Sequence, residues 1–169
     1  MAKRIRDSQM SKVYKWENKT LPYYGKKSHY TGEQLSLDQC EQLVHEAIAW
    51  WFRNPKPRMP LIKNGKGTTI ARGSSRTINL PRWARNHGVV LHETTHCLID
   101  RMKHNDVDGG HGAYFMRTYI ELLGYFLKED KAELVRRAKA EKIKVIPLKY
   151  VNRPKKKESI IRAIYRKVA

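Results

Sequence analysis

The sequence contains little cysteine and no long apolar run. Its two cysteines, Cys40 and Cys97, are too few for a disulfide framework and lack the paired spacing of a zinc finger or ribbon. No stretch of about 18 apolar residues is present that could cross a bilayer, and no apolar segment of signal-peptide type follows the basic N-terminus. These absences favour a soluble protein of a reducing compartment. We expect the cytoplasm, which would be the host cytoplasm for a phage protein, or the nucleus in a eukaryote, and no membrane partner.

Acidic residues are also scarce, with 16 Asp and Glu against 35 Lys and Arg, and the net charge is +19. The excess is at the two ends. Residues 1–30 carry 8 basic and 2 acidic side chains, residues 131–169 carry 14 and 3, and the remaining 13 and 11 lie between them. Basic ends attract polyanions, of which nucleic acid is the commonest in a cytosol, although a solvated charge run without a binding role is the alternative.

The chain length of 169 residues suits one domain with a core of its own. The charge distribution divides it into a basic N-terminal arm over residues 1–30, a core over residues 31–130, and a basic helical C-terminal extension over residues 131–169. No repeat and no long linker of low complexity interrupts the chain.

The pattern of apolar residues predicts an α+β fold. Helical spacing with a capping box of Ser36 and Gln39 predicts a helix over residues 36–53. Short stretches with β-formers between glycine-containing breaks predict a small antiparallel sheet within residues 57–81. Pro81 suits the first turn of a helix that runs through His92 and His96. The remaining expectations are an irregular arm or short strand over 14–34 and helices over 112–127, 130–142 (capped by Asp130) and 158–168.

The motif His92-Glu93-Thr-Thr-His96 carries the chemistry. Two histidines four residues apart lie about 40° apart on one face of a helix, so both rings can bind one ion. Glu93 is rotated by about 100°, which suits it less to bind the ion than to take a proton from a water molecule there. Apolar neighbours indicate that this helix is buried, where two histidines and an acid need partners. The alternative is a pair of core histidines with ordinary hydrogen bonds.

A catalytic zinc site needs a third protein ligand and an open position. His111, between two glycines and before a new helix, is the favoured third ligand. Asp106 and Asp108 are alternatives because carboxylates also bind zinc. His104 is less suitable, since it falls on the same helix as His96 or at its end.

Three further residues have candidate roles. Asp100, four residues beyond His96, could accept the second ring N–H of a ligand histidine, or it could be a solvated acid. Tyr114 is a candidate to stabilise the oxyanion formed when a carbonyl is attacked, although packing is the commoner role of such a tyrosine. We expect Cys97 to be a buried, unreactive thiol.

The combination of His92-Glu93-x-x-His96 with the later segment "GHGAYF" resembles the SprT-like zinc metalloproteases. In that family the first motif is followed by Gly-His-Gly-x-x-Phe/Trp, and the similarity covers roughly residues 36–127. The resemblance implies a zincin-like domain, Zn²⁺ on His92, His96 and His111, Glu93 as the catalytic acid and base, and Phe115 as the aromatic of the second motif. Many members carry a C-terminal zinc ribbon for DNA binding, and this chain lacks the cysteines for one.

These observations together predict a zinc-dependent metallopeptidase with a protein substrate. The basic ends suggest that it acts on DNA-bound or DNA-crosslinked proteins. Two alternatives stay open: a phage-type or regulatory metallohydrolase with a partner other than DNA, and a nucleic-acid-binding protein whose zinc is structural or vestigial. The sequence predicts neither cleavage specificity nor oligomeric state.

Overall fold

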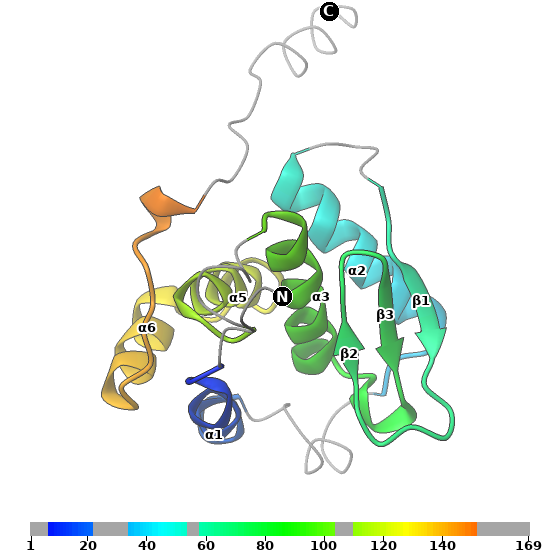
Figure 1. Cartoon of the computed structure of the whole chain (residues 1–169), viewed down its shortest axis with the longest axis horizontal. Coiled ribbons are helices and arrows are strands. Elements are labelled where there is room, and N and C mark those ends of the chain that lie inside the picture. Colours follow the sequence, from blue (N-terminus) through cyan, green and yellow to red (C-terminus); the bar gives the residue numbers. More distant parts are fainter. Residues whose placement is uncertain (1–6, 22–33, 54–57, 104–109, 152–169) are drawn as a thin grey trace, which may run out of the picture.

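A computed structural model describes residues 7–21, 34–53, 58–103 and 110–151. Within these ranges the fold is mixed α+β, with five α-helices and one three-stranded sheet (Figure 1). None of the described helices is long and apolar enough to cross a membrane. The helix expected over residues 158–168 lies outside the described residues. The elements are α1 (Met10–Thr20), α2 (Leu37–Phe52), β1 (Leu61–Asn64), β2 (Arg72–Gly73), β3 (Thr77–Leu80), α3 (His87–Arg101), α5 (Ala113–Phe126) and α6 (Lys131–Ala140).

Helix α3, which carries the His-Glu-x-x-His motif, is the centre of the fold. It lies between the sheet and α5, and it packs against α2 as well (Figure 1). Eleven of its residues are buried, among them Leu91, Leu98 and Ile99. Four of these eleven are polar: His92, Glu93, Thr94 and Thr95. The hydroxyls of Thr94 and Thr95 donate to the carbonyl oxygens of Val90 and Leu91 one turn earlier. The helix therefore satisfies its own buried hydroxyls and leaves only the motif side chains in need of partners.

The sheet has the strand order β1-β3-β2. Strand β2 pairs with β3 in antiparallel fashion, but β1 and β3 are parallel, so the prediction of an antiparallel sheet is wrong for that pair. The reason is the connection after β1, which leads to β2 at the opposite edge of the sheet; β3 then turns back and fills the central position. Strand β2 is therefore an edge strand, and it lies along α3.

The N-terminal segment is part of the core. Residues 10–20 form helix α1, where we expected an arm or a short strand, and Val13, Trp16 and Glu17 are buried. Helix α1 also packs against α6, where Lys19 pairs with Glu141 at 2.6 Å. The expected boundary near residue 31 therefore does not separate an arm from the core. The boundary near residue 130 does not separate the C-terminal extension either, because Leu134 and Ala138 of α6 are core residues.

The predicted helix caps are largely confirmed. Ser36 and Gln39 form the reciprocal capping box of α2, and the Asp130 side chain accepts two backbone N–H groups at the start of α6. The start of α3 differs from the prediction. Pro81 precedes a short 3₁₀ helix, Arg82–Ala84, and α3 begins at His87, where the Asn86 side chain accepts the N–H of Val89 at 3.0 Å. An asparagine cap thus replaces the expected proline start.

Candidate metal centre

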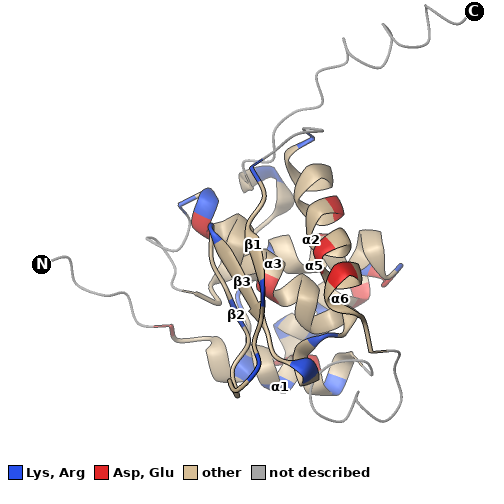
Figure 2. Cartoon of the chain, turned by 90° about the vertical axis from the view of Figure 1, so that its right-hand side faces the viewer, with Lys and Arg blue, Asp and Glu red and all other residues tan. Residues whose placement is uncertain are grey.

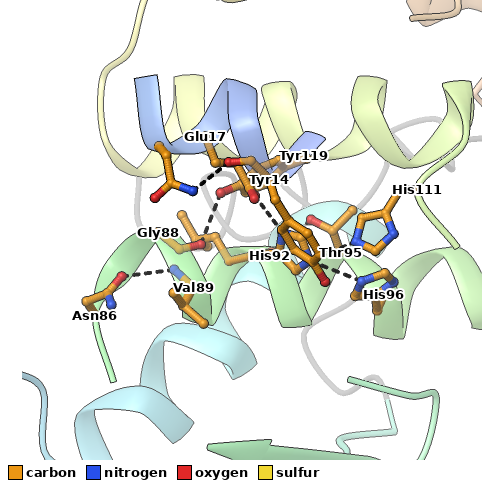
Figure 3. Close-up of polar contacts among 12 residues, drawn as sticks. Tyr14, Glu17, Asn86, Gly88, Val89, His92, Thr95, His96, His111 and Tyr119 are labelled. Atoms are coloured by element: carbon orange, nitrogen blue, oxygen red, sulfur yellow. Dashed lines mark hydrogen bonds and ion pairs between the residues drawn. The ribbon is translucent and has the colours of Figure 1, made fainter. Parts of the chain in front are cut away.

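Three histidines from two segments meet at one point, as we expected from the sequence. His92 and His96 come from α3, and His111 comes from the turn before α5. The Nε2 atom of His92 lies 3.1 Å from Nε2 of His96 and 3.2 Å from Nε2 of His111 (Figure 3). The three ligand atoms lie within 4.8 Å of one another, so the group could hold a metal ion.

Two carboxylates from the N-terminal segment hold the outer nitrogens of two of these rings. Glu17 Oε1 lies 2.6 Å from His92 Nδ1, and Asp7 Oδ2 lies 2.6 Å from His111 Nδ1. Asp7 Oδ2 also accepts the backbone N–H of His111 at 3.0 Å, while its other oxygen accepts the backbone N–H of Met10 at the start of α1. Figure 3 shows Glu17 reaching from α1 toward His92. One carboxylate therefore fixes each of these two imidazoles.

This hydrogen bonding favours a cation between the rings. A carboxylate can only accept, so the Nδ1 atoms of His92 and His111 donate their hydrogens to it, and in the neutral form of each ring the Nε2 atom carries a lone pair. Lone pairs 3.2 Å apart repel each other unless a cation lies between them. In a tetrahedral site with zinc–nitrogen bonds of about 2.05 Å, two ligand nitrogens lie about 3.3 Å apart. The observed separations and the all-imidazole donor set both fit Zn²⁺.

The surroundings keep the rings of His92 and His96 neutral, and all three histidine rings pack against Phe115. Burial lowers the pKa of His92 and of His96 well below the usual value, and the other histidines of the group lower both further. Phe115 of α5 is fully buried, and its ring centroid lies 4.6 to 5.0 Å from those of the three histidines. A neutral imidazole is the form that binds a metal, so these surroundings favour binding at neutral pH.

Glu93 is buried next to His92 and lies against strand β2. Burial raises its pKa to about 8, Glu17 adds to the rise, and a hydrogen bond from the Gly73 N–H and the charge of Arg72 oppose it. Gly73 has no room for a side chain, because a Cβ there would lie 2.0 Å from the carbonyl oxygen of Glu93. The close contact between β2 and α3 thus places a backbone donor on the motif glutamate.

Tyr14 of α1 lies over the histidines on the side opposite to the sheet (Figure 3). Its ring stacks on that of His92 with centroids 5.7 Å apart and meets the ring of His111 edge-on at 5.2 Å. Burial raises the pKa of Tyr14 to about 12, with smaller contributions from Glu93, Glu17 and Asp7. The hydroxyl therefore keeps its proton at neutral pH.

The other residues singled out in the sequence lie in different surroundings. Asp100 Oδ2 accepts the backbone N–H of Ser75 at 2.7 Å, so it holds the turn after β2, which is neither of the two roles considered from the sequence. Tyr114 is partly buried against the core, and its role at an oxyanion stays a prediction. Cys97 is buried, as expected. The alternative ligands His104, Asp106 and Asp108 lie outside the described residues.

The pH dependence of stability offers a test of the buried Glu93 in metal-free protein. Its pKa is about 8 when folded and about 4.5 when unfolded, so between these values the folded state binds more protons and stability falls as pH rises. Metal-free Glu93→Gln should therefore be more stable than wild type by on the order of 3 kcal/mol at pH 8, and by little at pH 5. The histidines contribute equally to the pH dependence of stability in wild type and in the variant, so their contribution cancels in the difference. Thermal unfolding in a chelator at the two pH values measures the difference, and an equal difference at both would contradict the buried carboxyl.

Replacement of Glu17 by glutamine tests the support of His92. Glutamine keeps the shape and can still accept the Nδ1 hydrogen, but the negative charge that makes the ring a better ligand is lost. We expect zinc affinity to fall by about 10- to 100-fold. Competition with a chromophoric chelator measures it. Glu46→Gln on the exposed side of α2 is the matched control, and equal affinities of the two variants would show that Glu17 does not support the ligand.

Four residues of the site were not predicted from the sequence: Asp7, Tyr14, Glu17 and Gly73. A signal for the helix that carries Tyr14 and Glu17 was present, because Val13, Trp16 and Glu17 recur at helical spacing and Lys12, Lys15 and Lys19 occupy other positions. The mixture of aromatic residues with Gly, Pro and Lys that follows favoured an irregular arm or a short strand instead. No sequence signal would have distinguished Gly73 from a glycine in an ordinary turn.

Comparison of the chain with protein-family models, with curated proteins and with solved structures finds no match. The likeness to SprT-like metalloproteases therefore stays a resemblance of the two motifs.

Proposed function

We propose that this protein is a zinc-dependent metallopeptidase of the zincin type. The observation that carries the proposal is the convergence of three histidine Nε2 atoms beside the buried Glu93, with two of the three rings fixed by carboxylates. His92, His96 and His111 would hold the metal. A zinc ion held there would act as a Lewis acid toward water and toward a substrate carbonyl.

The protein groups around the site supply the proton transfers. Glu93 would accept a proton from the attacking water and pass it to the nitrogen of the leaving amine, which is the role of a general base and then a general acid. A carboxyl with a pKa near neutrality is suited to both steps, and the Gly73 N–H orients it. Phe115 and the other buried rings exclude bulk water from the inner side of the site.

The test of this proposal is metal content together with hydrolysis. Purified protein should contain one zinc per chain by mass spectrometry and should cleave members of a pooled library of quenched-fluorescent peptides. Cleavage should stop with 1,10-phenanthroline and return with added zinc. Protein that binds no zinc at neutral pH would overturn the metal centre, and zinc-loaded protein that cleaves nothing in the library would overturn the peptidase.

For the substrate we propose proteins bound or crosslinked to DNA, and a cytoplasmic or nuclear location follows from that. The support is the excess of Lys and Arg in residues 1–30 and 131–169. Figure 2 shows that both signs of charge are interspersed over the described part of the chain. Cleavage of a DNA-bound protein should exceed that of the same protein free in solution at low salt, and the difference should shrink as salt rises. Equal rates at low salt would favour a partner other than DNA.

A further inference from the structure

We infer that Tyr14 is a catalytic residue of the proposed peptidase, whose hydroxyl donates a hydrogen bond to the substrate carbonyl oxygen as that oxygen gains negative charge. The inference rests on the proposed function. It goes beyond the two motifs, because Tyr14 belongs to an N-terminal helix that neither motif includes.

The first support is the position of the ring. Tyr14 contacts the rings of both His92 and His111, so its side chain reaches the point where the three histidines converge (Figure 3). Tyr14 is nevertheless 39% exposed, whereas His92 and His111 are 1% and 4% exposed. Tyr14, together with the partly exposed His96, is therefore accessible to a substrate that arrives from solvent.

The second support is the hydroxyl itself. Among the described residues the Tyr14 hydroxyl has no hydrogen-bond partner. Tyr119, another tyrosine that contacts His92, is different, because its hydroxyl donates to the carbonyl oxygen of Gly88 at 3.2 Å. The polar group of Tyr119 thus links α5 to α3. Phenylalanine would make the same ring contacts as Tyr14, so the free donor is the feature that distinguishes the tyrosine.

The third support is that Tyr14 is held rigidly. Its neighbours Val13 and Trp16 are fully buried, and Glu17 is tied to His92. Gln9, one turn earlier, donates to the carbonyl oxygen of His111 at 3.0 Å and accepts the N–H of Lys144 at 2.6 Å. A donor fixed before the reaction stabilises developing charge without a cost of reorganisation.

In the proposed reaction Glu93 transfers the proton and Tyr14 only donates a hydrogen bond. The oxygen of water bonds to the carbonyl carbon, the bond from that carbon to nitrogen breaks, and the proton travels through Glu93 to the departing nitrogen. Tyr14 keeps its proton throughout and contributes only a hydrogen bond, strongest when the carbonyl oxygen is most negative. Its removal should slow turnover and leave substrate binding unchanged.

The test uses Tyr14→Phe in the full chain, with a library peptide that wild-type protein cleaves. We expect kcat to fall by about 10- to 100-fold with KM within about twofold, and zinc content and Tm unchanged. The second readout is calorimetric binding of a phosphonamidate analogue of the same peptide, whose tetrahedral phosphorus mimics the attacked carbonyl. Its affinity should fall by the same factor as kcat. Tyr125→Phe, which changes an exposed tyrosine on α5, is the matched control and should change neither quantity by more than about threefold.

The outcomes separate the Tyr14 role from the proposed function. Unchanged kcat and unchanged phosphonamidate affinity in Tyr14→Phe would overturn the role of Tyr14 and leave hydrolysis standing, provided that activity still depends on Glu93. Loss of zinc or a lowered Tm in Tyr14→Phe would assign the hydroxyl a structural role and would also overturn the inference. A wild-type protein that cleaves no peptide would overturn the peptidase itself, and the role of Tyr14 with it.

Discussion

Glu93→Gln is expected to lose peptide hydrolysis by about 10²- to 10⁴-fold and to keep its zinc, because the substitution removes the general base and leaves the ligands in place. Glutamine has the shape of glutamate, and its side-chain oxygen can still accept the Gly73 N–H. It cannot accept a proton from water at neutral pH. Turnover of a cleavable peptide measures the loss, and mass spectrometry of the purified variant measures the zinc.

Asp100→Asn is the matched control for Glu93→Gln. It is the same loss of one carboxylate from the same helix, and asparagine can still accept the Ser75 N–H. We expect activity within about threefold of wild type, since Asp100 supports a turn and no ligand. Activity retained by Glu93→Gln would show that another group moves the proton. Loss of zinc by Glu93→Gln would show that the glutamate serves the metal centre in place of catalysis.

The sequence predicts the elements whose patterns are local. The capping box at Ser36 and Gln39 and the apolar period after it define α2 almost to the residue. The same kind of evidence predicts α5, α6 and the helical spacing of His92 and His96. The grouping of His111 with those two could also be expected, because a catalytic zinc needs a third ligand and the residue types limit the choice.

Longer-range features could not be predicted. Whether β1 is parallel to β3 depends on the path of a loop across the end of the sheet. The residues of the strands themselves do not determine that path. The partners of the ligand histidines are similarly distant, since Asp7 is 104 residues from His111 and Glu17 is 75 residues from His92. Asp100 had the right spacing on α3, but its face of the helix meets the turn after β2.

The position of α1 links metal binding to the folding of the chain. The segment that supplies Asp7, Glu17 and Tyr14 is also the one whose Val13 and Trp16 fill the core. Burial of Glu17 without a partner would cost several kcal/mol, and the N–H of His92 offsets that cost. Helix α1 therefore both fills part of the hydrophobic core and, through Glu17, fixes the ring of His92.

Gly73→Ala is the second change with a large expected effect, because it acts on the contact between β2 and α3. The added Cβ would lie 2.0 Å from the carbonyl oxygen and 2.8 Å from the carbonyl carbon of Glu93. These are backbone atoms of a buried helix, so neither can rotate away and β2 has to move. We expect a loss of about 3 kcal/mol of stability, from the destabilising effect of overpacking. For a chain of this length the loss lowers Tm by about 6 to 12 °C.

The same displacement should reduce hydrolysis more than zinc binding in Gly73→Ala. The Gly73 N–H moves away from the Glu93 carboxylate when β2 shifts, whereas Glu17 and Asp7 still hold His92 and His111, and Phe115 still packs against all three rings. Gly67→Asn is the matched control: Gly67 has a φ of 80° and open space around it, a conformation that asparagine tolerates. We expect its Tm to fall by no more than about 3 °C. A Gly73→Ala protein with the Tm and activity of wild type would show that β2 does not hold Glu93, and that the position of the glutamate is set by α3 alone.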